Sequence, residues 1–432
     1  MILFGHPGGN PNSHHAALAH FEAGRLAAFC VPWMPTPKQL QFLSRLPGCA
    51  AAARRVERRC FPPLLNAPRI EGKPGEWLRL LRRFSGLGAD ERLSYEANDW
   101  LMRTMRRACH RSDVTAVHSY EDCSLWQFEE AKRLGKICIY DMPIGYYPWW
   151  QDKQAQLAKR FSDWLPPGGL PANRWARPEQ KLREMELADL VLVPSRFVEQ
   201  TIRAFHPQKK IAFAPYGVDL EFWKTKTQRQ NSEILKAEKL KGDEANTGIS
   251  ACQDVGVSAL RPLRFIFAGQ CSIRKGTPVL LEAWRKADLP DAQLELVGSW
   301  QMAADKLKSL PPNVIFTGPV SRAELRERYQ ASDVFVFPSF FEGFGLVLLE
   351  AMACGLPAIA SDASAGPDVL TPATGRVIPA DAPDALVETL RWFAANRVII
   401  PAMKTAARVA AEKFTWENYR RSVSDAVGDL KI

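Results

Sequence analysis

The stretch from Ser332 to Asp362, SDVFVFPSFFEGFGLVLLEAMACGLPAIASD, constrains the fold of this chain more than any other. It begins with the apolar run VFVF, which is short enough for a buried strand of a parallel sheet. A glycine-containing loop follows, and the residues from Leu346 to Cys354 then predict a helix, with Gly355 in the position that commonly ends one. Strand, loop and helix in this order predict one unit of an α/β fold.

Two glutamates stand eight residues apart in this stretch. Glu342 lies in the loop, and Glu350 lies about one turn inside the predicted helix. Helical side chains lean toward the helix N-terminus, so Glu350 is expected to point toward the loop. Glu350 has almost no polar neighbours, and burying an unpaired carboxylate costs several kcal/mol. A solvated surface glutamate therefore fits poorly, and the pattern favours a ligand site at a helix N-terminus, which suits anionic or hydroxyl-rich groups.

The frame P-S-x-x-E-G-F-G-L-V-x-x-E-A-M-A-x-G-x-P resembles the donor-site motif of retaining glycosyltransferases of family 4. The resemblance implies that Glu342 is catalytic, beside the donor sugar, and that Glu350 binds the ribose hydroxyls. It extends from about Asp113 to the end of the chain and is vague over residues 36–111. The substrate-binding residues that it implies within the motif are Gly343, Phe344, Gly345, Leu346, Val347 and Glu350.

Length and composition agree with a globular enzyme. The 432 residues suggest two or three domains, and the hydrophobic share of 46% and charged share of 24% are ordinary for a soluble protein. No run of 18 apolar residues occurs, and the first four residues are too short and uncharged for a signal peptide. The nine cysteines show no C-x-x-C or other metal-ligand spacing. We therefore expect a cytoplasmic protein.

The net charge of +10 is confined to the first half of the chain. Residues 1–210 carry 31 Lys and Arg against 21 Asp and Glu, whereas residues 211–432 carry 26 of each kind. A basic face suits nucleic acid, anionic lipid or an anionic acceptor. No helix-turn-helix, RRM or zinc-finger pattern accompanies the charge, so nucleic acid is not expected as a partner.

A short amphipathic helix is predicted within this basic half, over Glu76–Phe84. Trp77, Leu80, Leu81 and Phe84 share one of its faces. Ordinary packing with arginines on the wet side explains this pattern. The alternative is a helix that docks on an acceptor or on the membrane surface. This second interpretation predicts weak peripheral contact with an anionic membrane at its inner face.

The chain opens with a Rossmann-like pattern. Ile2–Phe4 predict a strand, a Gly-rich loop follows, and His14–Ala23 predict a helix. The loop is not G-x-G-x-x-G, so a dinucleotide is not predicted. The family resemblance implies that Gly8 and Gly9 line the substrate site. The side chains of adjacent histidines on a helix, such as His14 and His15, point in different directions. We therefore expect no metal site in this region.

Two further candidates follow predicted strands of the first half. The stretch Asp113–Ser119 predicts a strand with His118 at its carboxyl end, where open α/β sheets bind ligands. It resembles the family's D-V-V-H-x-H strand, whose second histidine contacts the donor sugar, which implies a catalytic role for His118. A core histidine is the alternative. Residues Lys136–Tyr140 predict the next strand, and Asp141 after it is a candidate substrate-binding residue.

A loop of the second half has the features of a diphosphate site. In Gly269–Gly276, a glycine follows a predicted strand, and two adjacent cations, Arg274 and Lys275, precede the next glycine. The loop resembles the family's G-R-x-x-x-x-K-G, in which an Arg and a Lys meet the pyrophosphate. Gln270 stands in the Arg position, so Arg274 is the candidate replacement beside Lys275. The resemblance also places Val320 near the nucleotide base.

These patterns predict an α/β protein of two Rossmann-like domains that face each other across a cleft, the B-type glycosyltransferase (GT-B) fold. We expect an N-terminal acceptor-binding domain over residues 1–208 and a C-terminal donor-binding domain over 209–412. Residues 224–262 contain no aromatic residue and predict a flexible insertion. The family resemblance implies that residues 413–432 form a helix that crosses back to the N-terminal domain.

The family resemblance implies transfer of a hexose, with retention, from a nucleotide sugar to a hydroxyl of a sugar or lipid-linked glycan, in cell-surface glycan or polysaccharide biosynthesis. This is the predicted function. No Asp-x-Asp pair stands out, so neither metal nor cofactor is expected, and the cations must stabilise the leaving diphosphate. One alternative is a non-catalytic protein that binds sugar nucleotides. Another is a basic protein that binds nucleic acid, whose affinity would fall steeply with salt.

Overall fold

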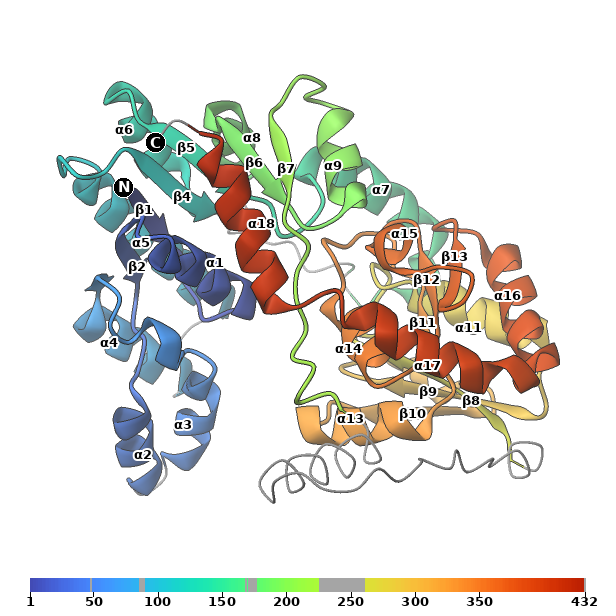
Figure 1. Ribbon diagram of the computed structural model, residues 1–432. Coiled ribbons are helices and arrows are strands. Elements are labelled where there is room, and N and C mark those ends of the chain that lie inside the picture. The colour runs from blue at the N-terminus through green and yellow to red at the C-terminus, as the bar shows by residue number, and fades with distance from the viewer. Residues whose placement is uncertain (47–48, 85–89, 168, 170–176, 225–260, 431–432) are drawn as a thin grey trace, which may run out of the picture. The chain divides into compact units, whose positions relative to one another are not determined.

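The computed structural model describes residues 1–46, 49–84, 90–167, 169, 177–224 and 261–430. The chain forms two compact units (Figure 1). The first comprises Met1–Gln151, Pro171–Gly217 and Trp416–Ile432, and the second comprises Asp152–Leu170 and Val218–Thr415. Most of the predicted insertion, residues 225–260, lies outside the described residues.

The first unit contains a seven-stranded parallel sheet in the order β3-β2-β1-β4-β5-β6-β7. Its strands are β1 (Ile2–Gly5), β2 (Leu26–Val31), β3 (Arg69–Glu71), β4 (Ala116–Tyr120), β5 (Ile137–Asp141), β6 (Leu190–Val193) and β7 (Ile211–Phe213). Strands β1, β2, β4 and β6 are buried along their whole length. The sequences of β1, β2 and β6 are apolar, as strands buried on both faces require, whereas β4 also buries His118 and Ser119. The strand order reverses between β1 and β4, and ligands of such sheets bind outside the carboxyl ends of the strands at this point.

The helices of the first unit connect the strands of this sheet or, in the case of the last one, return to it from the second unit. They are α1 (Pro11–Glu22), α2 (Pro37–Arg45), α3 (Ala50–Glu57), α4 (Lys73–Phe84), α5 (Asp90–Ala108), α6 (Leu125–Arg133), α8 (Pro178–Leu187), α9 (Arg196–Arg203) and α18 (Trp416–Gly428). The last of these packs against α1 (Figure 1). The His15 ring stacks on Trp416 with 4.6 Å between centroids, and Arg420 Nε donates to Glu22 Oε2 over 2.8 Å. The C-terminal helix therefore belongs to the first unit.

The second unit contains a six-stranded parallel sheet in the order β10-β9-β8-β11-β12-β13. Its strands are β8 (Leu263–Ala268), β9 (Ala292–Val297), β10 (Val314–Gly318), β11 (Val334–Phe337), β12 (Ala358–Ser361) and β13 (Gly375–Ile378). This is the strand order of a dinucleotide-binding Rossmann sheet, with the reversal between β8 and β11. Two Rossmann-like domains, as the sequence predicts, are therefore present.

Seven α-helices of the described chain, and a segment that precedes them in sequence, complete the second unit. The helices are α11 (Thr277–Ala287), α12 (Ala304–Lys308), α13 (Arg322–Ala331), α14 (Leu346–Ala353), α15 (Gly366–Val369), α16 (Pro383–Ala395) and α17 (Ile400–Ala411). Helix α7 (Tyr147–Arg160) begins in the first unit, and residues 152–170 belong to the second, whereas the sequence places them in the N-terminal domain. Ion pairs hold this segment there: Lys153 and Arg160 pair with Asp381.

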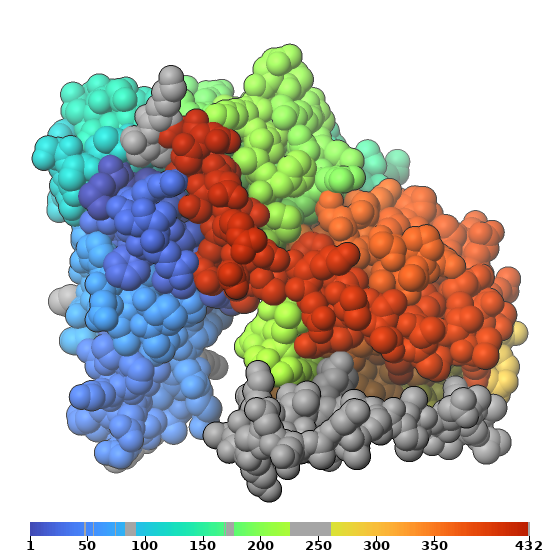
Figure 2. Space-filling model, in the orientation of Figure 1, coloured from blue at the N-terminus to red at the C-terminus, as the bar shows by residue number. Residues whose placement is uncertain are grey.

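Helix α4 differs from its predicted pattern. Leu80 is buried and packs with Trp33 and Val56, whereas Trp77 and Leu81 are 49% and 65% exposed. The predicted face is therefore split, because the core of this region reaches only one side of the helix. Residues 37–46 and 49–84 contribute the blue to light-blue part of the first unit's surface at the lower left of Figure 2.

Candidate active site

The switch point of the second sheet is formed by two loops that touch closely. The loop Gly269–Gly276 follows β8, and the loop that begins at Pro338 follows β11. Gly276 has φ +73°, and a Cβ at this position would lie 2.0 Å from the Pro338 carbonyl oxygen. Phe340 N also donates to Arg274 O over 2.9 Å. A glycine is thus required for the two loops to meet, and their side chains converge at the ligand-binding edge of the sheet.

Arg274, Lys275 and Glu342 form one charged cluster at this edge. Glu342 Oε1 accepts a hydrogen bond from Arg274 Nη1 at 3.0 Å and lies 2.5 Å from Lys275 Nζ. Arg274 Nη1 also donates to the Phe341 carbonyl at 2.8 Å. The predicted cation pair is therefore brought together, and both members are bound to the predicted catalytic glutamate. Two cations and one carboxylate leave a net charge of +1.

Burial gives this cluster its electrostatic strength. The side chains of Lys275 and Glu342 are 13% and 9% exposed. Burial lowers the pKa of Lys275, the charge of Arg274 lowers it further, and Glu342 opposes both effects. The Lys275 ammonium also lies 5.2 Å from the centre of the Phe337 ring. An anion that enters this site would meet two cations at low effective dielectric, where charge interactions are strong.

Helix α14 begins directly beside the cluster. Its N-cap Gly345 has φ +87° and supplies no capping side chain, and a Cβ there would lie 2.5 Å from the Phe337 ring. Leu346 and Val347, the first two residues of the helix, are half-buried, so the helix N-terminus is partly open to solvent. The helix dipole and the first amides favour an anion or hydroxyl at this position.

Glu350 lies one turn inside α14. Its side chain is 18% exposed, and Arg322 Nη2 is 4.0 Å from its Oε1. Burial raises the pKa of Glu350 to about 7, and Arg322 only partly opposes the rise. A buried carboxylate of this kind is stabilised when a ligand donates hydrogen bonds to it.

The other predicted residues of this unit lie at three places. Gly343 and Phe344 are buried in the loop between Glu342 and α14. Gln270 is exposed, whereas Arg274 is bonded to Glu342. Val320 is half-buried two residues beyond the carboxyl end of β10.

His118 differs from its predicted position. Strand β4 begins at Ala116 rather than at residue 113, so His118 is its central residue and not its last. Its side chain is fully buried, its Nδ1 lies 2.8 Å from His20 Nε2, and burial lowers its pKa to about 3. Because this neutral ring is buried inside the sheet, it exposes no surface that a sugar could contact. His118 is therefore a core residue, and the prediction that it lies at the end of its strand was wrong.

Asp141 does end its strand, as predicted. It is 3% exposed, its Oδ2 lies 3.8 Å from His118 Nε2, and burial raises its pKa to about 7. The buried hydroxyls of Tyr120 and Tyr419 interact with it and oppose that rise. Sequence reasoning did not single out either tyrosine. Tyr419 lies on α18, 278 residues beyond Asp141, and only the fold brings it here.

Gly8 and Gly9 lie in the loop beyond β1, at the binding edge of the first sheet. Gly8 N donates to His6 Nδ1 over 2.9 Å. A Cβ on Gly9 would lie 2.7 Å from the Cα atom of Arg59. The two glycines therefore let the loop fold tightly against a residue that the sequence did not single out.

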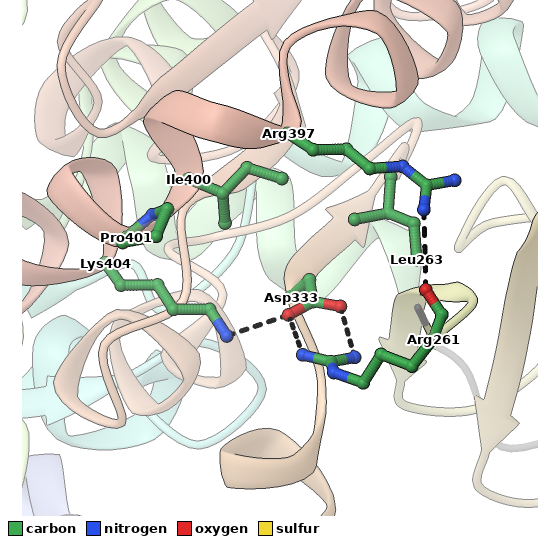
Figure 3. Close-up of a pocket in the computed structure, with 7 residues that line it drawn as sticks. All are labelled: Arg261, Leu263, Asp333, Arg397, Ile400, Pro401 and Lys404. Carbon is green, nitrogen blue, oxygen red and sulfur yellow. Dashed lines mark hydrogen bonds and ion pairs between the residues drawn. The ribbon is translucent and has the colours of Figure 1, made fainter. Parts of the chain in front are cut away.

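A separate pocket of about 160 Å³ lies at the opposite edge of the second sheet (Figure 3). Asp333 precedes β11, and its carboxylate accepts two hydrogen bonds from Arg261, at 2.6 and 2.8 Å, and one from Lys404 at 2.9 Å. Arg397, in the same pocket, donates to the Asp291 carbonyl at 2.8 Å. These charges bond to groups of the protein and tie β8, β11 and α17 together. We regard the pocket as structural.

Among the residues in the described parts of the chain, no group of three or more His, Cys, Asp or Glu is placed to hold a metal ion. No helix among them is both long and apolar enough to cross a membrane.

Comparison with solved structures decides the fold. Over 99% of this chain and 97% of the other, it matches the sucrose-phosphate synthase (tll1590) from Thermosynechococcus elongatus, with a TM-score of 0.60 and 17% identity. It matches Anabaena Alr3699/HepE in complex with UDP-glucose over 99% of both chains, with a TM-score of 0.59 and 15% identity. The fold is that of the GT-B glycosyltransferases.

Sequence relatives agree with the GT-B assignment. Residues 254–413 match the family model described as Glycosyl transferases group 1. A GDP-mannose-dependent monoacylated alpha-(1-6)-phosphatidylinositol monomannoside mannosyltransferase of Corynebacterium glutamicum is 31% identical over 261 residues, which are 57% of this chain and 63% of that protein. The aligned regions span between 42% and 63% of the length of three such curated relatives.

Proposed function

We propose that this protein is a glycosyltransferase that moves a hexosyl group from a nucleotide sugar to a hydroxyl of a sugar or lipid-linked glycan. The observation that carries the proposal is the cluster of Arg274, Lys275 and Glu342 at the switch point of the second unit. The match of this unit to the group 1 family model supports it. The Corynebacterium relative is named for GDP-mannose, and the Anabaena structure holds UDP-glucose, which supports a nucleotide sugar as donor.

In this proposal the donor diphosphate binds to Arg274 and Lys275. Breaking the bond from the sugar to the diphosphate adds negative charge to the leaving phosphate, and fixed cations that are already in place stabilise it. Arg274 can hold two phosphate oxygens with its planar fork, whereas Lys275 acts as a point charge. We propose that these groups and the α14 N-terminus do this without a metal ion.

The two glutamates take different roles. Glu342 lies among the cations and is assigned to the sugar, while Glu350 accepts hydrogen bonds from the ribose hydroxyls. For transfer with retention, the acceptor oxygen bonds to the anomeric carbon on the face from which the diphosphate leaves, and the acceptor proton passes to a leaving phosphate oxygen. No other base is required in this scheme. Asp141 and His118, both buried in the first unit, are assigned to positioning.

A transfer assay tests the proposal. Purified protein is incubated with UDP- and GDP-sugars, with and without a hydroxyl acceptor, and release of the nucleoside diphosphate is measured. We expect release by the wild type and loss of it in Lys275→Gln. The matched control is Lys286→Gln, a half-exposed lysine of the same unit, which should keep the wild-type rate. Binding of donors without any turnover would instead support a non-catalytic sugar-nucleotide protein.

We also propose weak peripheral contact with an anionic membrane through α2 and α4. Trp77, Leu78 and Leu81 on α4 are 49%, 61% and 65% exposed, and Phe42 on α2 is 67% exposed. Exposed basic residues accompany them at positions Lys38, Arg45, Arg54 and Arg58. Apolar side chains with cations around them suit the headgroup region of anionic lipid.

Liposome co-sedimentation tests this contact. The wild type should bind vesicles that contain anionic lipid and not neutral ones, and the double variant Leu78→Ser, Leu81→Ser should lose most of that binding. The control is Val398→Ser, an 86% exposed apolar residue of the second unit. Equal binding of neutral and anionic vesicles would reject the contact.

A further inference from the structure

The first unit holds an arginine in its interior, directly against the Gly-rich loop. Arg59 follows α3, is 6% exposed, and contacts Gly9, whose Cβ would lie 2.7 Å from the Cα atom of Arg59. Burial lowers the pKa of this guanidinium, which nonetheless stays charged because arginine titrates far above neutral pH. A buried charge of this kind needs a partner.

The carboxylate that pairs with Arg59 is shared with a second arginine, so it neutralises this charge only in part. Glu76 is the one carboxylate that is bonded to Arg59 within the described chain, through a 2.5 Å hydrogen bond from Nη1 to Oε1. Arg79 already forms two hydrogen bonds with Glu76, from Nε to Oε2 at 2.7 Å and from Nη2 to Oε1 at 2.6 Å, and a third with Leu93 O at 3.1 Å. Two arginines share one carboxylate, so the buried triad carries a net charge of +1.

The remaining donors of Arg59 are unused. Across the residues that the structure describes, Nε and Nη2 of Arg59 form no hydrogen bond. Arg79, in contrast, uses all three of its nitrogen atoms. The triad therefore leaves two donors of a fixed fork without an acceptor, and the fork geometry matches the oxygens of a phosphate group.

Among the described residues, Glu76 is the one carboxylate whose charge acts on Arg59, and the other groups around Arg59 add donors. The loop of Gly9 leads into α1, a 12-residue helix whose N-cap Asn10 forms no side-chain capping bond. His14, in the first turns of α1, is 2% exposed, and its Nε2 has no partner among the described residues. The charge of Arg59 acts on His14, so the two side chains are near each other. A helix N-terminus and an unpartnered buried imidazole thus accompany the surplus cation.

We infer that Arg59, with the loop at Gly9 and the N-terminal turn of α1, binds a phosphate group carried by the acceptor. The inference rests on the proposed function, in which the donor diphosphate occupies Arg274 and Lys275 of the second unit. The Arg59 site lies beyond the carboxyl end of β1, which is the ligand-binding edge of the first sheet. A phosphate there would balance the triad charge and accept the two unused hydrogen bonds. The acceptor class is thereby a phosphorylated hydroxyl compound.

Phosphate could reach this site from three sources, which small probes separate. A donor diphosphate would be displaced by a saturating nucleoside diphosphate. A phosphate monoester, as in a sugar phosphate, is represented by methyl phosphate, and a phosphodiester, as in a lipid headgroup, is represented by dimethyl phosphate. Titration calorimetry of both probes is therefore done with the full chain, at constant ionic strength, with UDP or GDP at saturation.

The test compares Arg59→Gln with Arg107→Gln, an exposed arginine on α5 of the same unit. Wild type and Arg107→Gln are expected to bind at least one of the two probes with equal affinity, and Arg59→Gln is expected to bind it at least about tenfold more weakly. Nucleoside diphosphate affinity should be the same in all three. Arg79 still neutralises Glu76 in Arg59→Gln, so this variant is expected to fold. If it does not, Arg59→Lys, which keeps the charge and loses the fork, is measured instead and should also bind more weakly.

Three results would overturn the inference. They are equal probe affinity in the wild type and Arg59→Gln, loss of probe binding when the nucleotide is added, and no probe binding by the wild type at all. If no nucleoside diphosphate binds, the proposed function fails on its own. In that case the same titrations without nucleotide still decide whether Arg59 binds phosphate.

Discussion

Replacing Glu350 by Gln should stabilise the empty protein at alkaline pH while it weakens donor binding. Burial raises the pKa of Glu350 from 4.5 to about 7, so the native state holds a proton that the unfolded chain has lost. The stability that this proton contributes is full below pH 4.5 and is lost as the pH rises through 7. Glutamine has a similar shape, stays neutral at every pH and carries no such dependence.

The size of the effect follows from the two pKa values. Linkage gives a loss of about 2 kcal/mol in the unfolding free energy of the wild type between pH 5.5 and 8.5 from Glu350 alone. The variant lacks this loss, so its stability relative to the wild type should rise by about 2 kcal/mol over the same range. Other buried acids, such as Asp141, titrate in both proteins and cancel in the difference.

Urea unfolding of wild type and Glu350→Gln at pH 5.5 and 8.5 measures this difference. The control is Glu282→Gln, which changes a glutamate with a 40% exposed side chain in the same unit. Its unfolding free energy should differ from that of the wild type by the same amount at both pH values. A gap between Glu350→Gln and wild type that does not change with pH would refute the reasoning, since it would mean that Glu350 is ionised in the folded protein throughout.

Three further predictions concern the same site. Glu342→Ala should abolish transfer, and circular dichroism should show an intact fold; transfer at the wild-type rate would remove Glu342 from the reaction. Arg274→Lys should slow transfer roughly tenfold although the charge is kept, because the fork is lost; an unchanged kcat would leave Lys275 as the effective cation. Gly345→Ala should cost about 2–5 kcal/mol of stability, from its φ of +87° and the 2.5 Å approach to the Phe337 ring, and thermal unfolding at the wild-type temperature would contradict this.

Local patterns were enough to predict the fold. Alternation of short apolar runs with amphipathic segments indicates parallel α/β units, since each pattern depends on residues close together in the chain. The cluster of Arg274, Lys275 and Glu342 was also within reach, because each residue follows a strand and the carboxyl ends of parallel strands share one edge. The fold and this cluster therefore need no long-range information.

Long-range packing limited the other predictions. His118 was placed at the end of its strand, but hydrogen bonds from Thr115 and Ala116 to Met1 O shape the start of β4, and its ring then faces His20. The contact of Arg59 with Gly9 depends on how the α2–α4 segment returns to the loop after β1. No spacing in the sequence encodes such contacts, because they arise only when distant segments pack together.

Affinity for nucleoside diphosphates against monophosphates tests the central claim most directly. If Arg274 and Lys275 hold the donor diphosphate, the wild type should bind either UDP more tightly than UMP or GDP more tightly than GMP. Lys275→Gln should lose about tenfold or more of that preference, while Lys286→Gln keeps it. Equal affinity for the diphosphate and the monophosphate, or a preference that survives in Lys275→Gln, would contradict a donor site at this cluster.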